Sequence, residues 1–544
     1  MPRETATSLI PHAFAAIAKQ DPDRIWISSA VSKNIAQDGF RDVTLRQAQE
    51  AIDRIAWHIE ESLGKSSNFE TVAYIGLPDA RYPMVCLAGT KTGHKILVLS
   101  HFNSVTFNKH LCESTNCHTV LHTEGVERLL KPLQEALPMK AVQAPSLDTL
   151  LDDSIAAKPY PYTKSFEDGY DDPVVVGHTS GTTGLPKPVT WTQKSYAFVE
   201  THLHVPDLDG RPAYAKLLNS SKRCYQSMPI YHPFGLVMAI TEPLYYGKTI
   251  ILGPIEQGPI SPGVLEQMFE HVEFDSFSGV PIYLEMMTKS PKILDLVSRK
   301  LKYILYAGGA LSKPTGETLS VRTKLHNLYG STEAGVAFGH VVDREDWEWL
   351  CLNEAFSGIE WEPCEVNGVG GVYEMTFVRT PETETRQHVF WHTDCGEVFK
   401  ANDLFIKHPT KAHHWMFYSR KDDMIVTKFG WNVNPILLER AIAQHPAVKH
   451  VVVGGSGKKN VCAVIQLKDD EAALPEAPLE SIWPAVEKGN VVNDAAGQLA
   501  KERIIFATEG KPFPLAGKGN VQRVAVLKMY EDELESLYTR FGDE

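Results

Sequence analysis

Residues 174–187 contain the side chains best suited to bind a highly charged ligand. An apolar run at 174–176 leads into a loop with the sequence HTSGTTGLPK over 178–187. Small residues let backbone N–H groups approach phosphate oxygens, hydroxyls add further donors, and a lysine adds positive charge. The spacing Gly181-x2-Gly184-x2-Lys187 does not match a Walker A loop. We therefore predict a polyphosphate-binding loop of another type rather than a flexible Gly/Thr linker.

Alternating strands and helices are predicted to position this loop. Apolar spacing predicts a helix over 43–64, a strand over 71–77, a helix over about 80–92 and a strand over 95–99. Strands that alternate with helices favour parallel sheets joined by crossovers. Further strand-like runs lie at 174–177, 249–252, 303–306 and 451–453.

A polar, charged stretch at 418–424 separates two predicted domains. Residues 1–419 are expected to form a large α/β N-terminal domain with mixed or parallel sheets. Residues 420–544 carry a helix pattern over 435–445 and a strand pattern over 450–453, and we expect a small, mobile α+β domain there.

Charge and cysteine content exclude several other classes. The 544 residues carry 54 Lys and Arg against 67 Asp and Glu, a net charge of −13, which argues against a nucleic-acid-binding protein. Of eight cysteines only Cys112 and Cys117 are close, and their spacing is a poor zinc pattern, so reduced thiols are expected. The N-terminus lacks a signal-peptide pattern and no 18-residue apolar run exists, which favours a cytoplasmic protein without membrane spans. The glycine clusters at 368–371 and 454–459 are interpreted as turns, because neither has nucleotide-loop spacing.

Five motifs in order resemble those of the adenylate-forming superfamily, which includes acyl-CoA synthetases, peptide-synthetase adenylation domains and luciferases. They lie at 87–93 (LAGTKTG), 179–187, 229–235 (PIYHPFG), 306–310 together with 327–333, and 514–518 (PLAGK). The segments 100–120, 403–410 and 517–523 look most like adenylation domains of fungal peptide-synthetase-like enzymes and carboxylate reductases. The resemblance covers nearly the whole chain.

The resemblance implies ATP-dependent joining of a carboxylic acid to AMP, with pyrophosphate released and Mg²⁺ required. Thr332 would contact the α-phosphate, Glu333 would bind Mg²⁺ and Tyr329 would stack on adenine. The alternatives are an N-cap role for Glu333 and core packing for Tyr329. The full ATP-binding set implied is Thr179, Ser180, Gly181, Thr182, Thr183, Gly184, Lys187, Gly308, Gly309, Ala310, Asn327, Tyr329, Gly330, Thr332, Asp403, Arg420 and Lys518.

Two carboxylates compete for the ribose-binding role that the resemblance implies. Asp394 lies 26 residues before Arg420 and Asp403 lies 17 before it; the family separation is nearer the shorter value. We therefore predict Asp403, with Arg420 also at the ribose. The hinge motif of the family falls on 418–425, with Asp422 at the hinge position. Lys518 corresponds to the catalytic lysine, whose compact charge could neutralise both carboxylate and α-phosphate.

The acid substrate is expected to lack a free α-amine. Amino-acid-activating relatives place an aspartate where this chain has His232, after Tyr231. A histidine cannot form that salt bridge, which favours an aryl, α-keto or acyl acid. His232 could steer the carboxylate or gate the pocket, or it could simply pack beside Pro233. The substrate-binding set implied by the resemblance is Tyr231, His232, Ser278, Ala307, Gly309, Leu328, Val336 and Ala337.

The leading hypothesis is an adenylating domain that passes its acyl group to a phosphopantetheine thiol on a carrier partner. No carrier attachment motif is present in the sequence, and the resemblance favours a domain of a larger synthetase over a standalone ligase. The alternatives are an aryl- or acyl-CoA ligase, a non-catalytic AMP- or acyl-binding module, and a P-loop kinase, the last disfavoured by the missing Walker spacing.

Overall fold

The computed structural model describes residues 8–100, 103–180, 186–254, 260–366, 369–429, 431–468, 475–491, 497–508, 510–515 and 521–541. These residues divide into two units. The first comprises 8–180, 186–359 and 378–399, and the second comprises 360–377 and 400–541.

The first unit contains a seven-stranded sheet in the order β13-β12-β11-β9-β10-β1-β2. Its strands are β1 (Ile25–Ala30), β2 (Phe40–Thr44), β9 (Arg223–Gln226), β10 (Thr249–Leu252), β11 (Ser276–Gly279), β12 (Tyr303–Tyr306) and β13 (Lys324–Asn327). Every neighbouring pair is parallel except β1 and β2. β10 and β12 are buried along their whole length, which explains why their sequences are continuous apolar runs without alternation.

A six-stranded sheet in the same unit has the order β6-β5-β3-β4-β7-β8. Its strands are β3 (Thr71–Ile75), β4 (Lys95–Val98), β5 (Thr119–His122), β6 (Lys140–Gln143), β7 (Pro173–Ser180) and β8 (Pro186–Thr192). Only β7 and β8 pair antiparallel. The predicted phosphate loop therefore joins the last two strands of this sheet.

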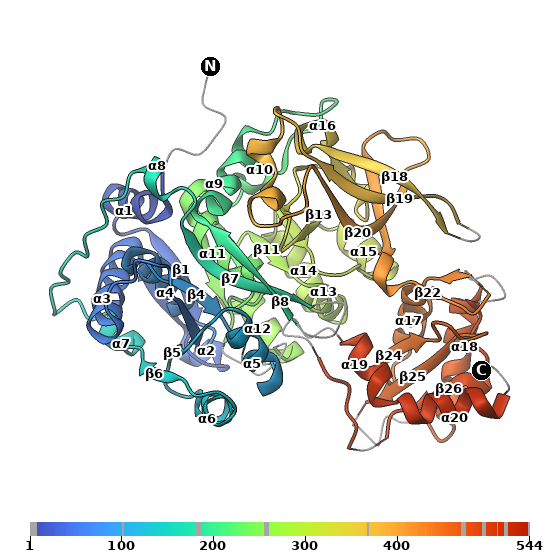
Figure 1. Ribbon diagram of the computed structural model, residues 1–544. Helices are drawn as coiled ribbons and strands as arrows, with labels where there is room; N and C mark the ends of the chain where they lie inside the picture. Colours follow the sequence, from blue (N-terminus) through green and yellow to red (C-terminus); the bar gives the residue numbers. More distant parts are fainter. Residues whose placement is uncertain are drawn as a thin grey trace. The chain divides into compact units, whose positions relative to one another are not determined.

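Helices cover both faces of both sheets (Figure 1). α3 (Leu45–Leu63), α4 (Arg81–Thr92) and α11 (Pro233–Tyr246) share one hydrophobic core with a face of each sheet. The outer faces are covered by α5 (Val105–Ser114) and α6 (Glu127–Ala136) on one sheet, and by α12 (Pro262–His271), α13 (Pro281–Thr288), α14 (Pro291–Lys300) and α15 (Lys313–Ser320) on the other. The remaining helices are α1 (Ile10–Gln20), α2 (Ile35–Asp38), α7 (Leu147–Leu150), α8 (Phe166–Gly169), α9 (Gln193–Thr201), α10 (Tyr214–Leu218) and α16 (Glu354–Ser357).

The second unit contains a run of four neighbouring strands, a two-stranded hairpin and a three-stranded sheet. β18 (Ile359–Val366), β19 (Val369–Val378), β20 (Val398–Lys407) and β21 (His414–Arg420) follow each other in the order β21-β20-β19-β18. The hairpin β22 (Ile425–Val426) and β23 (Asn432–Val433) leads to the sheet β24 (Val448–Gly454), β25 (Cys462–Leu467) and β26 (Ile504–Phe506). α17 (Pro435–Ala443) and α18 (Pro478–Asn490) cover one face of that sheet, and α19 (Arg523–Met529) and α20 (Glu531–Phe541) cover the other.

Local sequence signals explain where helices α3 and α11 begin. α3 starts at a capping box in which Thr44 and Gln47 each satisfy the other's backbone N–H. α11 starts with Pro233 at its first position, and the Nδ1 atom of His232 accepts a hydrogen bond from the Phe234 N–H at 3.2 Å. The predicted helix over 43–64 corresponds to α3, and the α/β fold class is confirmed.

Candidate active site

The carboxyl ends of four parallel strands carry most of the predicted site. β9 leads to Tyr231, β11 contains Ser278, β12 is followed by Ala307, and β13 is followed by Leu328. In the register of the sheet Ser278 lies between Gln226 and Leu305, and Tyr306 lies beside Asn327. Ligands of open α/β sheets bind at this edge, so these members of the predicted site lie where the fold expects a ligand.

Residues 306–310 and 327–330 lie next to each other at that edge. Gly308, Gly309 and Ala310 are exposed. Gly308 has a φ of +83°, which a residue with a Cβ rarely adopts. The backbone carbonyl of Asn327 accepts a hydrogen bond from the Tyr214 hydroxyl at 3.0 Å, and Tyr329 is half-buried.

Thr332 and Glu333 lie in the turn of a short hairpin formed by β14 (Gly330–Ser331) and β15 (Gly335–Val336). The two strands approach closely at Gly330, where a Cβ would lie 2.7 Å from the Gly335 carbonyl oxygen. Within the turn the Ser331 hydroxyl accepts the Ala334 N–H at 3.0 Å. Glu333 therefore does not cap a helix, and its carboxylate has no hydrogen-bond or ion-pair partner among the described residues.

The phosphate loop lies at the tip of the β7–β8 hairpin. Thr179 pairs with Lys187 and Ser180 pairs with Pro186 across the two strands. Lys187 is exposed, and its ammonium has no partner among the described residues. Gly181, Thr182, Thr183 and Gly184 lie outside the described residues, as does Lys518.

His232 and Tyr231 occupy the turn before α11. Because Nδ1 of His232 accepts the Phe234 N–H, the neutral ring carries its proton on Nε2. Tyr231 is buried, and burial raises the pKa of its hydroxyl well above the usual range. The two side chains thus present a neutral hydrogen-bonding pair rather than a charged anchor.

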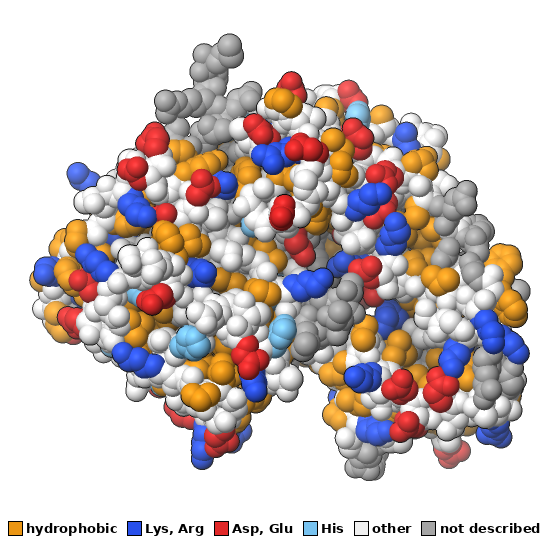
Figure 2. Space-filling view, in the orientation of Figure 1, with side chains coloured by type: hydrophobic (Ala, Val, Ile, Leu, Met, Phe, Trp, Pro, Cys, Tyr) orange, Lys and Arg blue, Asp and Glu red, His pale blue; other side chains and the backbone are white. Residues whose placement is uncertain are grey.

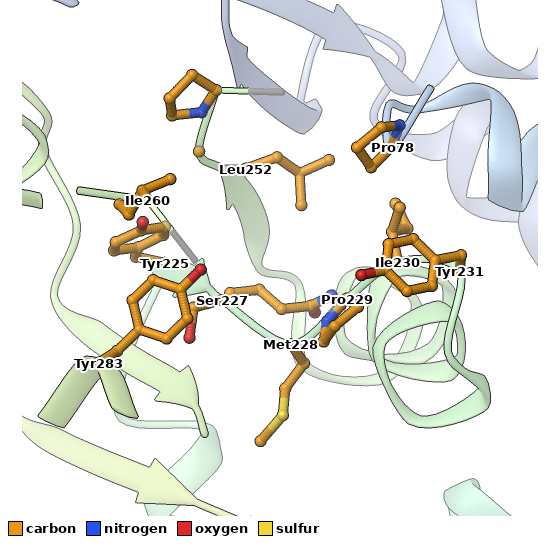
Figure 3. Close-up of a pocket in the computed structure, with 13 residues that line it drawn as sticks. Pro78, Tyr225, Ser227, Met228, Pro229, Ile230, Tyr231, Leu252, Ile260 and Tyr283 are labelled. Carbon is orange, nitrogen blue, oxygen red and sulfur yellow. The ribbon is translucent and has the colours of Figure 1, made fainter. Parts of the chain in front are cut away.

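A cavity of about 100 Å³ opens beside this turn (Figure 3). Figure 3 shows Tyr231 and Tyr283 on opposite sides of the cavity. None of the described residues that line it is charged. They are Pro78, Tyr225, Gln226, Ser227, Met228, Pro229, Ile230, Tyr231, Leu252, Gly253, Pro254, Ile260 and Tyr283.

Tyr231 is the one member of the predicted substrate set that lines this cavity. Ser278 is buried, and its hydroxyl oxygen lies 3.5 Å from the Cys224 thiol. The others, namely His232, Ala307, Gly309, Leu328, Val336 and Ala337, lie at the strand ends without bordering it. The predicted set and the cavity therefore meet only at Tyr231.

Asp403 and Arg420 belong to the second unit, where they lie directly opposite each other on β20 and β21. The Arg420 Nε atom is 3.8 Å from Asp403 Oδ1, and the carboxylate side chain is 12% exposed. Arg420 also approaches Asp422, with Nη2 to Oδ2 at 3.5 Å. Asp394 lies in the first unit, is exposed, and forms no ion pair with a described residue.

The segments that flank Lys518 are firmly held within the second unit. Leu515 and Val521 form an isolated bridge, and the Gln522 N–H donates to the Pro514 carbonyl at 2.9 Å. Arg523 then forms a two-pronged ion pair with the half-buried Glu439, at 2.5 and 2.7 Å. The base of the predicted catalytic loop is therefore anchored to α17.

The sequence reasoning missed three residues that hold the Thr332–Glu333 turn. Trp191, His388 and His392 each donate a ring N–H to one of its two carbonyls. No spacing rule links position 191 to 388–392, so only the folded structure brings them together.

The available donors suit a magnesium nucleotide. Mg²⁺ takes oxygen ligands and is commonly bound through one or two carboxylates together with phosphates, which matches the Glu333 carboxylate, free of partners among the described residues. The Lys187 ammonium, which likewise pairs with no described residue, and the exposed Gly308–Gly309 backbone suit phosphates and a base. Figure 2 shows cationic and anionic side chains interspersed over the face in view, without a large basic area.

This fold and this site define an adenylate-forming enzyme. The AMP-binding enzyme family model matches residues 14–354, and the AMP-binding enzyme C-terminal domain model matches residues 422–542. The chain belongs to the AMP-binding enzyme family and is an acid–AMP ligase. Enzymes of this family use ATP and Mg²⁺.

Fungal multidomain enzymes are among the similar curated proteins. The chain is 31% identical to the isocyanide synthase-NRPS hybrid crmA of Aspergillus fumigatus, covering 98% of this chain and 34% of that protein. It is 29% identical to a carboxylic acid reductase of Neurospora crassa and 26% identical to the adenylate-forming reductase Nps10 of Heterobasidion annosum. These matches cover 96% and 97% of this chain but 50% and 49% of the relatives, so the chain spans half or less of their length.

Solved structures with the same fold include two CoA ligases. A benzoate CoA ligase from Burkholderia xenovorans matches with a TM-score of 0.69 and 17% identity, over 95% of this chain and 99% of that one. The anthranilate CoA ligase AuaEII, in complex with anthranoyl-AMP, matches with a TM-score of 0.70 and 16% identity, over 97% and 98%. Among the described helices, none combines the length and apolar character needed to cross a bilayer.

Proposed function

We propose that the chain activates a carboxylic acid without an α-amine and passes the acyl group to the phosphopantetheine thiol of a carrier domain. The observation that carries this proposal is the convergence of Gly308, Asn327 and the Thr332–Glu333 turn at one sheet edge, with a Glu333 carboxylate that pairs with none of the described residues. The substrate class, the carrier and the residue roles below belong to the proposal.

The proposed first step forms a mixed anhydride. A carboxylate oxygen of the acid attacks the α-phosphorus, the bond to the β-phosphate breaks, and pyrophosphate leaves. The reactants repel each other, so catalysis consists mainly of alignment and charge neutralisation. When bound, Mg²⁺ supplies positive charge to the phosphates. Residues 179–187 hold the β- and γ-phosphates, and Lys518 neutralises the carboxylate and the α-phosphate.

The proposed absence of an α-amine follows from the turn before α11. Nδ1 of His232 accepts the Phe234 N–H, and a histidine at this position supplies no carboxylate that could pair with an ammonium. The cavity that begins at Tyr231 has no charged lining among its described residues. We therefore propose an aryl, α-keto or acyl acid.

The proposed second step transfers the acyl group to a thiol. The sulfur attacks the acyl carbonyl, the bond to AMP breaks, and the thiol proton is released. The names of the relatives support a carrier-bound thiol, because a carboxylic acid reductase and adenylate-forming reductases share this region of the chain. Asp422 is the proposed hinge between residues 1–419 and 420–544 for the change between the two steps.

Pyrophosphate exchange into ATP tests the first step. The purified chain should catalyse exchange with at least one acid from a panel of benzoic, cinnamic, aryl-pyruvic and fatty acids, and no amino acid should be the best substrate. Lys518→Ala should reduce the exchange by several orders of magnitude while ATP binding, measured by calorimetry, largely persists. Near-normal exchange in this variant would refute the role of Lys518.

Absence of exchange with every acid would favour the alternative from another class, a non-catalytic AMP- or acyl-binding module. Lys187, Glu333 and Lys518 are all retained in the sequence, which disfavours that alternative. Best activity with an α-amino acid would refute the proposed substrate class without refuting adenylation.

A further inference from the structure

Three ring N–H groups converge on the two carbonyls of the Thr332–Glu333 turn. Trp191 Nε1 donates to the Thr332 oxygen at 2.8 Å. His388 Nδ1 and His392 Nε2 both donate to the Glu333 oxygen, at 3.1 and 2.6 Å. A carbonyl oxygen can only accept, so these contacts fix which nitrogen of each imidazole carries the proton. We call Trp191, His388 and His392 the carbonyl clamp.

The clamp is rigid because its rings also pack on one another. The His388 ring meets Trp191 edge-on at 4.6 Å and His392 at 4.4 Å between ring centres. Trp191 lies near the end of β8, whose other end carries Lys187. One strand therefore links the phosphate hairpin to the turn that carries Glu333.

Packing alone does not explain why histidines occupy positions 388 and 392. His388 Nε2 and His392 Nδ1 are buried without a hydrogen-bond partner among the described residues. A buried polar atom without a partner destabilises the fold, a cost that apolar side chains at these positions would avoid. The donors that the rings supply to the Glu333 carbonyl are the compensating feature.

We propose that Trp191, His388 and His392 are positioning residues that set the affinity of Glu333 for magnesium by fixing the backbone from which its carboxylate projects. This inference rests on the proposed function, in which Glu333 is the metal ligand. Groups that orient a metal ligand commonly change metal affinity about 10–100-fold when removed. The clamp differs from that pattern because it holds the main chain of the ligand instead of its side chain.

Matched substitutions separate the donor from the volume of each ring. In His392→Gln the amide nitrogen takes the place of Nε2, and in His388→Asn it takes the place of Nδ1, so both variants keep a donor. His392→Leu and His388→Leu remove it. His340→Leu is the control, because His340 Nε2 makes the same kind of buried contact, at 2.9 Å, to the Pro206 carbonyl outside the site. Glu333→Gln removes the proposed ligand itself.

The measurement is ATP binding to the full chain by calorimetry at a series of Mg²⁺ concentrations, with thermal unfolding recorded for every variant. The leucine variants should raise the half-saturating Mg²⁺ concentration about tenfold or more, whereas the amide variants should stay within about threefold of wild type. Binding of ATP without Mg²⁺ should change little. Trp191→Phe should raise the half-saturating Mg²⁺ concentration as the leucine variants do. If the leucine variants fail to fold, Trp191→Phe provides the test instead.

Two outcomes would overturn the clamp. One is a folded His392→Leu or Trp191→Phe that titrates with Mg²⁺ like wild type; the other is an equal shift in His340→Leu, which would show general destabilisation. Failure of the proposed function gives a different result, because Glu333→Gln would then bind Mg²⁺ and ATP like wild type.

Discussion

Asp403 and Arg420 show at the level of single residues how neighbouring strands can build a ribose site. They are paired in the β20–β21 register, and the mostly buried carboxylate has oxygens that can accept two hydroxyl hydrogen bonds. The Arg420 side chain is 44% exposed, so water can solvate its guanidinium group if the Asp403 carboxylate is removed. Loss of the Asp403 carboxylate should therefore affect a ligand more than the fold.

We expect Asp403→Ala to weaken ATP binding roughly 10–100-fold, because hydrogen bonds to a charged group contribute about 1.5–3 kcal/mol. Asp394→Ala is the matched control and should bind ATP like wild type, since Asp394 is exposed and unpaired among the described residues. Calorimetric titration with ATP measures both. The opposite order would assign the ribose to Asp394.

Sequence reasoning could propose residues inside ordered motifs, but it missed residues that support them. Thr332 and Glu333 could be proposed because they stand in a recognisable string next to Tyr329. Trp191 and His388 could not, because their importance arises from hydrogen bonds to main-chain carbonyls, which leave no spacing pattern.

At the level of elements, β13 ends at the proposed nucleotide site and carries a buried histidine without hydrogen-bond partners among the described residues. Asn327 ends the strand, and the preceding His326 is buried, with neither ring nitrogen hydrogen-bonded to a described residue. Burial, with a smaller effect of Lys324, lowers the pKa of His326 to about 3. The ring is therefore neutral in the folded protein at any pH well above about 3.

This histidine should make the protein less stable as the pH is lowered. The unfolded chain binds a proton below pH about 6.5 and the folded chain only below about 3, so the free energy of unfolding should decrease as pH falls between those values. The full loss is on the order of 3–5 kcal/mol. Above pH 6.5 the group should have no effect, because it is neutral in both states.

Chemical unfolding of wild type and His326→Leu at pH 7.5, 5.5 and 4.5 isolates this contribution. The variant should lose less stability than wild type on acidification, because leucine fills similar space without a titratable group. Parallel curves for the two proteins would show that His326 is not the responsible group.

The elements themselves were predictable where burial leaves a simple pattern. The fully buried strands β10 and β12 were expected as apolar runs at their observed positions. β18–β21 were not, because these strands mix polar and apolar residues, and the two-residue strands β14 and β15 are too short for any periodicity. The turn that carries Glu333 therefore required the structure.

At the level of the whole molecule, the two candidate acyl acceptors differ mainly in charge. Free CoA carries a phosphorylated nucleotide and gains affinity where cationic side chains meet its phosphates. A carrier domain presents the same thiol arm and gains from protein contacts and high local concentration. The cavity beside Tyr231 has no charged residue in its described lining, and the chain has a net charge of −13.

We therefore expect the activated acyl group to move to a phosphopantetheinylated carrier at least about tenfold more efficiently than to free CoA at equal concentration, because protein contacts worth about 1.4 kcal/mol give that factor. A radiolabelled acid selected by pyrophosphate exchange, with a carrier domain from a fungal adenylate-forming reductase, measures both transfers. The same carrier without its phosphopantetheine is the control and should remain unlabelled. Equal or faster formation of the CoA thioester would instead identify a standalone aryl- or acyl-CoA ligase, because transfer would then need no contact with a carrier protein.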